Sequence, residues 1–180
     1  RAASAPLAKS PVARRTGAPM AIARLYSVYG PWEEPSRLMP TLLVHAIGGR
    51  LPPLANPDTA RDFVYVDDVI AALRCVAEAR HVAPGEIVNV GTGRQQTLRD
   101  VVSIVRRLTS LDREPQWGRM AAREWDTDTW VGDVSRIRER FGWSAAVSLE
   151  EGIERMLRWF QQSPERVLQY QQRGRSAPVA

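Results

Sequence analysis

The chain has 180 residues, which suffices for one hydrophobic core or for one core with a smaller lobe. A hydrophobic fraction of 44% with 25% charged residues is typical of a globular protein. No apolar run approaches the roughly 20 residues that span a bilayer, so no membrane partner is expected. The net charge of +5 comes from arginines scattered among acids, without interleaved aromatic residues, which argues against a nucleic-acid partner.

Metal-ligating and disulfide-forming residues are scarce. Cys75 is the only cysteine, which rules out an intrachain disulfide and fits a reducing, cytoplasmic location. With two histidines and one cysteine, no ligand cluster at metal-binding spacing appears, so no metal site is expected. The chain begins without Met and without an apolar leader, and we expect it to start within a longer protein.

The first third of the chain predicts a short strand and a helix. Residues 1–19 are rich in Ala, Pro, Ser and Arg and are expected to be irregular. The apolar run 20–26 lies between two turn signals and favours a buried strand. Residues 40–47 predict a helix, which Gly48 ends, and a Pro/Asn/Asp loop follows at 50–60.

Two further strands follow, each leading into a helix. Residues 63–66 predict a strand, and Asp67 or Asp68 is expected to cap a helix that runs to about Arg80. Residues 87–90 predict another buried strand. The alternation of strands and helices indicates an α/β chain with a parallel sheet, and the few strands make only part of a doubly wound sheet.

Capping signals place the remaining helices. Residues 97–100 form a capping box that opens a helix to about Leu108, and residues 148–151 open another to about Gln162. Asp133 is expected to cap a short helix that ends at Gly142. Residues 163–180 are polar and are expected to form a flexible tail, which leaves 20–162 as the folded part.

Four segments in fixed order carry the functional signal. A diphosphate carries negative charge, and arginines that grip two oxygens at once are suited to hold it. The segments read Arg24-Leu-Tyr-Ser-Val-Tyr-Gly-Pro31, Ala60-Arg-Asp-Phe-Val-Tyr-Val-Asp-Asp68, Asn89-Val-Gly-Thr-Gly93, and Arg123-Glu-Trp-Asp126 leading to Asp133-Val-Ser-Arg136. Together they resemble the extended short-chain dehydrogenase/reductase family of NAD-dependent sugar-nucleotide epimerases and dehydratases.

The resemblance implies a fold and a ligand. The fold would be the C-terminal part of a Rossmann-type doubly wound parallel sheet, joined to a small mixed α/β lobe that binds substrate. The ligand would be a nucleotide-diphosphate sugar, with NAD as the cofactor. Arg61 and Arg123 would hold the diphosphate, and Asp126 would accept ribose or sugar hydroxyls.

Further site residues also follow from the resemblance. Tyr26 would approach the nicotinamide of NAD, and Ser27 would contact the substrate phosphate where the family usually has Asn, which leaves the substrate subclass open. The nucleobase would be cradled, largely through backbone, by the loops that contain Arg37, Leu38, Pro52 and Leu54.

The glycines at 91 and 93 are not interpreted as a dinucleotide-binding loop. The dinucleotide fingerprint G-x-G-x-x-G requires a third glycine, and Gln96 stands at that position. We expect residues 91–93 to form a turn at the end of a strand.

No catalytic residue is assigned in this chain. The family transfers hydride with the help of a Tyr-x-x-x-Lys pair, and none of the four tyrosines is followed four residues later by lysine. The hypothesis is therefore the substrate-binding portion of an enzyme, inactive alone, with NAD bound mainly by an N-terminal half outside this chain. Two alternatives stay open: a non-catalytic nucleotide-sugar binding module and a non-functional gene fragment. Family members are often dimers, so a homodimer of the parent is an expectation.

Overall fold

The computed structural model describes residues 11–118 and 129–176. These residues divide into two compact units. Unit 1 comprises 11–28, 61–95 and 130–146, and unit 2 comprises 29–60, 96–118, 129 and 147–176.

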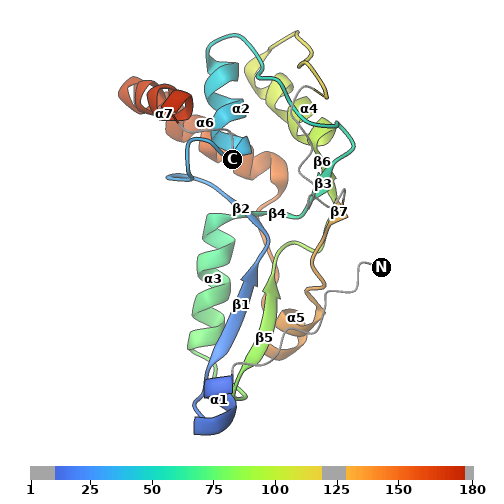
Figure 1. Ribbon diagram of the computed structural model, residues 1–180, viewed down its shortest axis with the longest axis vertical. Helices are drawn as coiled ribbons and strands as arrows, with labels where there is room; N and C mark the ends of the chain where they lie inside the picture. The colour runs from blue at the N-terminus through green and yellow to red at the C-terminus, as the bar shows by residue number, and fades with distance from the viewer. Residues whose placement is uncertain (1–10, 119–128, 177–180) are drawn as a thin grey trace. The chain divides into compact units, whose positions relative to one another are not determined.

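Unit 1 is built on a pair of parallel strands. Strands β1 (Ala21–Leu25) and β5 (Glu86–Val90) pair in parallel over their whole length, from Ala21 opposite Glu86 to Leu25 opposite Val90. Helix α3 (Val66–Ala77) packs against β1, and helix α5 (Ser135–Phe141) packs against β5 (Figure 1). The predicted α/β class is confirmed, and the carboxyl ends of the two strands lie at the same edge.

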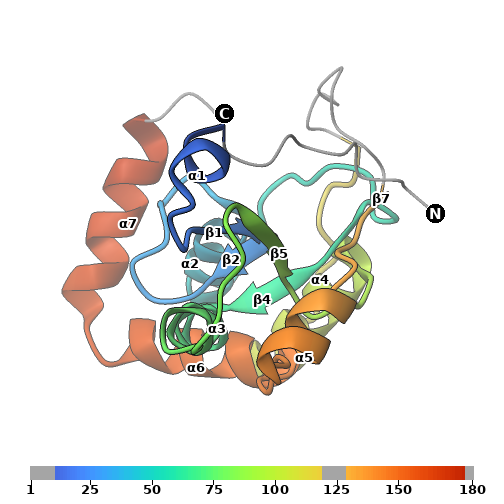
Figure 2. The same ribbon diagram turned by 90° about the horizontal axis from the view of Figure 1, so that it is seen from below.

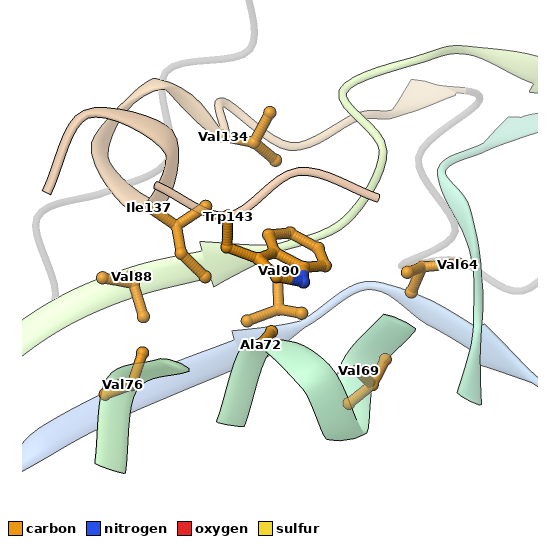
Figure 3. Packing of buried hydrophobic residues seen from close by; sticks show 9 residues of the cluster. All are labelled: Val64, Val69, Ala72, Val76, Val88, Val90, Val134, Ile137 and Trp143. Carbon is orange, nitrogen blue, oxygen red and sulfur yellow. The ribbon is translucent and has the colours of Figure 1, made fainter. Parts of the chain in front are cut away.

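The core of unit 1 covers one face of this strand pair. Helices α3 and α5 both contribute to it, and Figure 2 shows both on the same side of β1 and β5. The spacing of Val69, Ala72 and Val76 places them on one face of α3, which turns toward the strands. Figure 3 shows the complete cluster, which consists of Val64, Val69, Ala72, Val76, Val88, Val90, Val134, Ile137 and Trp143.

Short segments complete unit 1. Helix α1 (Pro11–Thr16) lies within the region that was expected to be irregular. Strand β2 (Ser27–Tyr29) pairs with β4 (Phe63–Tyr65). The short strands β3 (Ala60–Arg61), β6 (Gln96–Thr97) and β7 (Thr129–Trp130) form a sheet of order β6-β3-β7.

Two predicted helix caps are wrong. Helix α3 has Tyr65 as its N-cap, because strand β4 runs directly into the helix, and the neighbouring Asp67 and Asp68 lie in the first turn. Carboxylates there still favour the helix, since they face the positive end of its dipole. The N-cap of α5 is Val134, although the Asp133 side chain just before it accepts a hydrogen bond from the Ser135 backbone N–H at 3.0 Å.

Unit 2 is a cluster of four helices. They are α2 (Leu38–Ile47), α4 (Leu98–Thr109), α6 (Leu149–Gln161) and α7 (Pro164–Ser176). Helix α2 lies between α7 and α4 (Figure 1), and α6 contacts the other three. The fully buried side chains at the centre are Met39, Leu42, Leu43, Val101, Val105, Ile153, Met156 and Phe160.

Helix α7 occupies residues where a flexible tail was expected. Its start is marked by Pro164 and by the Ser163 hydroxyl, which accepts a hydrogen bond from the Arg166 N–H at 3.3 Å. Tyr170 is buried, and its ring lies edge-on to that of Phe160 with the centroids 5.0 Å apart. Packing against α6 and α2 therefore orders this polar segment.

The predicted capping box at Thr97 is confirmed. The Thr97 hydroxyl accepts a hydrogen bond from the Asp100 N–H at 3.1 Å, and the Asp100 carboxylate accepts one from the Thr97 N–H at 2.8 Å. We expect Thr97→Ala to lower the free energy of unfolding by about 1 kcal/mol in urea denaturation. The matched control is Ser103→Ala, on the exposed side of the same helix, which should change stability by no more than about 0.5 kcal/mol. Equal losses in the two variants would contradict the prediction.

Candidate functional site

The predicted site residues are distributed over both units. Tyr26, Ser27 and Arg61 belong to unit 1, while Arg37, Leu38, Pro52 and Leu54 belong to unit 2. Arg123 and Asp126 lie outside the described residues. Each group is therefore considered within its own unit.

In unit 1, the carboxyl ends of β1 and β5 bring several polar groups together. Tyr26 directly follows β1, and its backbone N–H donates to the carbonyl of Val90, the last residue of β5, at 3.1 Å. The next residue, Ser27, donates its backbone N–H to the Asp62 carbonyl at 3.0 Å. The strand ends are thereby tied to the segment that contains Arg61 and Asp62.

Asp62 accepts four hydrogen bonds through its carboxylate and is completely buried. One oxygen, Oδ1, accepts from the backbone N–H of Thr92 at 2.7 Å and from its hydroxyl at 2.6 Å. The other, Oδ2, accepts from the N–H groups of Gly93 at 2.9 Å and Gly132 at 3.2 Å. Asp62 thus joins three chain segments at one point.

These contacts account for the glycines at residues 91 and 93. The sequence predicted a turn at the end of a strand, and the structure places the turn directly after β5. Its N–H groups at Thr92 and Gly93 already donate to Asp62 and do not point at a free phosphate position. A Cβ added at Gly91 would lie only 2.6 Å from Oδ2 of Asp62, so this position requires glycine for close approach.

Tyr26 packs closely against the backbone of Gly132. A Cβ added at Gly132 would lie 2.7 Å from Cε2 of the Tyr26 ring. Burial raises the pKa of the Tyr26 phenol, the negative charge of Asp62 adds to this increase, and Arg24 opposes it. The phenol therefore stays protonated at neutral pH and is available as a hydrogen-bond donor.

Ser27 and Arg61 are half-buried at the same edge. Arg61 lies in β3, next to the residue that anchors the turn after β5. No role is assigned to Asp62 from the sequence, which misses it as a hydrogen-bond acceptor. Two signals were available in the sequence. Asp62 is an acid directly before a buried strand, and the glycine-flanked turn at residues 91–93 has backbone N–H groups that need an acceptor.

In unit 2, the residues of the predicted base-binding loops differ in exposure, and two of them have partners within the unit. Arg37 is exposed and pairs with Glu33, with Nε 3.2 Å from Oε1. Leu38 begins α2 and is half-buried. Pro52 and Leu54 are buried, and the Leu54 N–H donates to the Gln116 carbonyl at 3.0 Å. Their contact with a nucleobase stays a prediction.

Within residues 11–118 and 129–176, no group of three or more His, Cys, Asp or Glu side chains is placed to hold a metal ion. Over the same residues, no helix combines the length and the apolar character needed to cross a membrane.

Comparisons with a family model and with individual proteins find similarity to the same group of enzymes. The model of the NAD dependent epimerase/dehydratase family matches residues 8–91. The dTDP-glucose 4,6-dehydratase of Escherichia coli is 29% identical over 164 residues, which cover 84% of this chain and 45% of the relative.

Solved structures show the same similarity. The UDP-glucose 4-epimerase of Thermotoga maritima, determined with UDP-glucose, is 28% identical in sequence, with a TM-score of 0.71. The matched region covers 79% of this chain and 46% of the epimerase chain. The enzyme WbmF of Bordetella bronchiseptica, in complex with NADH, is 25% identical in sequence, with a TM-score of 0.75. The matched region covers 91% of this chain and 52% of the WbmF chain.

The chain is similar to NAD-dependent epimerases and dehydratases, and its fold is of the Rossmann type found in those enzymes. It spans between 22% and 45% of the length of the first curated relatives that it matches.

Proposed function

We propose that this chain forms the nucleotide-sugar-binding portion of an NAD-dependent epimerase or dehydratase. The observation that carries the proposal is the arrangement at the carboxyl ends of β1 and β5. There Tyr26 and Ser27 follow one strand, and Asp62, adjacent to Arg61, anchors the turn that follows the other. Ligands of open parallel sheets bind at this edge. The similarity to an epimerase determined with UDP-glucose supports the choice of ligand.

In this proposal the ligand is held mainly by charge and by hydrogen bonds. Arg61 binds the diphosphate of the nucleotide sugar, because its planar guanidinium pairs with two oxygens at once. Ser27 donates a hydroxyl to a phosphate oxygen, and Arg123 and Asp126 keep their predicted diphosphate and hydroxyl contacts. The loops that contain Arg37, Leu38, Pro52 and Leu54 contact the nucleobase.

Tyr26 is the residue of this chain that fits a nicotinamide. Its half-buried ring lies at the strand ends and combines an apolar surface with a protonated hydroxyl. NAD, when bound, supplies the hydride acceptor for oxidation of the sugar before epimerisation, dehydration or reduction. Because none of the four tyrosines precedes a lysine at the required spacing, we propose that the chain alone binds nucleotide sugars without oxidising them. NAD is then held mainly by residues outside this chain.

Calorimetric titration of the purified chain tests the proposal. UDP-glucose, dTDP-glucose, CDP-glucose and GDP-mannose are titrated separately, with free glucose and inorganic pyrophosphate as controls. At least one nucleotide sugar is expected to bind saturably and more tightly than pyrophosphate. Binding of every nucleotide sugar no tighter than that of pyrophosphate would contradict the proposed site. In a parallel assay at 340 nm, reduction of added NAD would contradict the proposal that the chain alone is inactive.

A further inference from the structure

One buried carboxylate holds three segments of unit 1 in place. Asp62 lies 30 and 31 residues from Thr92 and Gly93, and 70 residues from Gly132, yet it accepts a hydrogen bond from the backbone N–H of each. Its own carbonyl accepts from the N–H of Ser27. The turn after β5, the segment before α5 and the chain just after β1 therefore converge on a single residue.

The position of the Tyr26 ring depends on the same contacts. The backbone of Gly132 lies so close to the ring that a Cβ there would be 2.7 Å from Cε2 and 2.9 Å from Cζ. The N–H of Gly132 is held by Oδ2 of Asp62 at 3.2 Å, so the wall against which the ring packs is fixed by the carboxylate. A shift of Gly132 would either press on the ring or leave a gap behind it.

We propose that Asp62 is a positioning residue of the ligand site, which fixes the ring of Tyr26 and the backbone next to Arg61 at the carboxyl ends of β1 and β5. The ligand part of this inference rests on the proposed function. Asp62 is buried beneath the turn after β5, and it acts through the residues that would contact the nucleotide sugar and the nicotinamide.

The chemistry of the cluster requires a carboxylate at this position. Four donor groups converge on two oxygens, and only an ionised carboxylate offers acceptor sites on both. In Asp62→Asn, one oxygen becomes an NH₂ group, which faces N–H groups that then lose their acceptor. Hydrogen bonds to a charged acceptor are also stronger than those to a neutral one. The isosteric change therefore loosens one side of the cluster while it preserves the volume.

The first test uses readouts that need no ligand. In Asp62→Asn, the phenol titration of Tyr26, assigned by difference from Tyr26→Phe, is expected to move to lower pH, because a nearby negative charge is lost. The ring resonances of Tyr26 and the amide resonances of Thr92, Gly93 and Gly132 are expected to shift in the same variant. The matched control is Asp133→Asn, which removes an exposed charge that also raises the pKa of Tyr26 but leaves the cluster intact. Unchanged ring resonances in Asp62→Asn would overturn the proposal.

The second test uses UDP-glucose. At metal sites, loss of a residue that orients a ligand-binding side chain typically costs 10- to 100-fold in affinity. By analogy, Asp62→Asn is expected to bind UDP-glucose about tenfold more weakly, with Asp133→Asn near the wild type. Unchanged affinity despite shifted Tyr26 resonances would overturn a role for Asp62 in the ligand site. If the wild type binds no nucleotide sugar, the proposed function fails, whereas the ligand-free readouts still decide whether Asp62 positions Tyr26.

A second pair of variants applies if Asp62→Asn does not fold. Thr92→Val removes the hydroxyl that donates to Oδ1 at 2.6 Å, and Thr92→Ser retains it. Thr92→Val is expected to shift the Tyr26 ring resonances, and Thr92→Ser is expected to restore the wild-type positions. Identical ring resonances in both variants and the wild type would overturn the proposal.

Discussion

At pH 8, Glu33→Gln is expected to be more stable than the wild type by about 2 kcal/mol, whereas at pH 5 the two proteins are expected to be nearly equal. Glu33 lies in unit 2, and only 11% of its side chain is exposed. Burial raises the pKa of its carboxyl from 4.5 to about 7, although Arg37 opposes this increase. Among the described residues its oxygen Oε2 has no hydrogen-bond partner, which makes ionisation costly there.

The direction of the pH dependence follows from the protons bound in each state. Between about pH 4.5 and pH 7, the folded protein keeps a proton on Glu33 that the unfolded chain has released. The stability of the wild type therefore falls as pH rises through this window and then levels off. Glutamine cannot ionise, so this component of the decline is absent from the variant.

Urea denaturation at several pH values between 5 and 8 measures the effect. The control is Glu34→Gln, which removes the same charge from the exposed neighbouring residue and should leave the pH dependence of the wild type unchanged. Stability curves of Glu33→Gln and the wild type that run parallel over this range would show that the Glu33 pKa is not raised by folding.

The features that the sequence predicts well depend on local signals. The capping box at Thr97 involves residues three apart, and the parallel pair follows from two short apolar runs bounded by turns. In each case one segment, or a general rule of sheet geometry, contains the information.

The features that the sequence does not predict depend on distant contacts. The donors to Asp62 come from residues up to 70 positions away, and nothing near Asp62 in the chain identifies them. Helix α7 has a polar composition that suggested a flexible tail, and its order depends on the packing of Tyr170 against Phe160 of α6. The burial of Glu33 is likewise set by elements around it, since its neighbour Glu34 is exposed.

Arg61→Ala is expected to weaken the binding of UDP-glucose by about 10- to 100-fold, which corresponds to roughly 1.5–3 kcal/mol for hydrogen bonds to a charged group. Arg61 is half-buried in β3, and its backbone adjoins Asp62, the residue that anchors the turn after β5. Arg61→Lys retains the charge but not the planar fork that pairs with two oxygens, and an intermediate loss is expected.

Comparison of ligands and control variants locates the effect at the diphosphate. The loss in Arg61→Ala should be large for UDP-glucose and UDP but close to zero for uridine, which has no phosphate. Arg74→Ala is the matched control, because Arg74 is an exposed arginine of unit 1 whose Nη2 lies 3.5 Å from a carboxylate oxygen of Glu78. It removes the same charge and should leave affinity for all three ligands near that of the wild type. If Arg61→Ala and Arg74→Ala weaken UDP-glucose equally, the effect comes from net charge, and Arg61 does not bind the diphosphate directly.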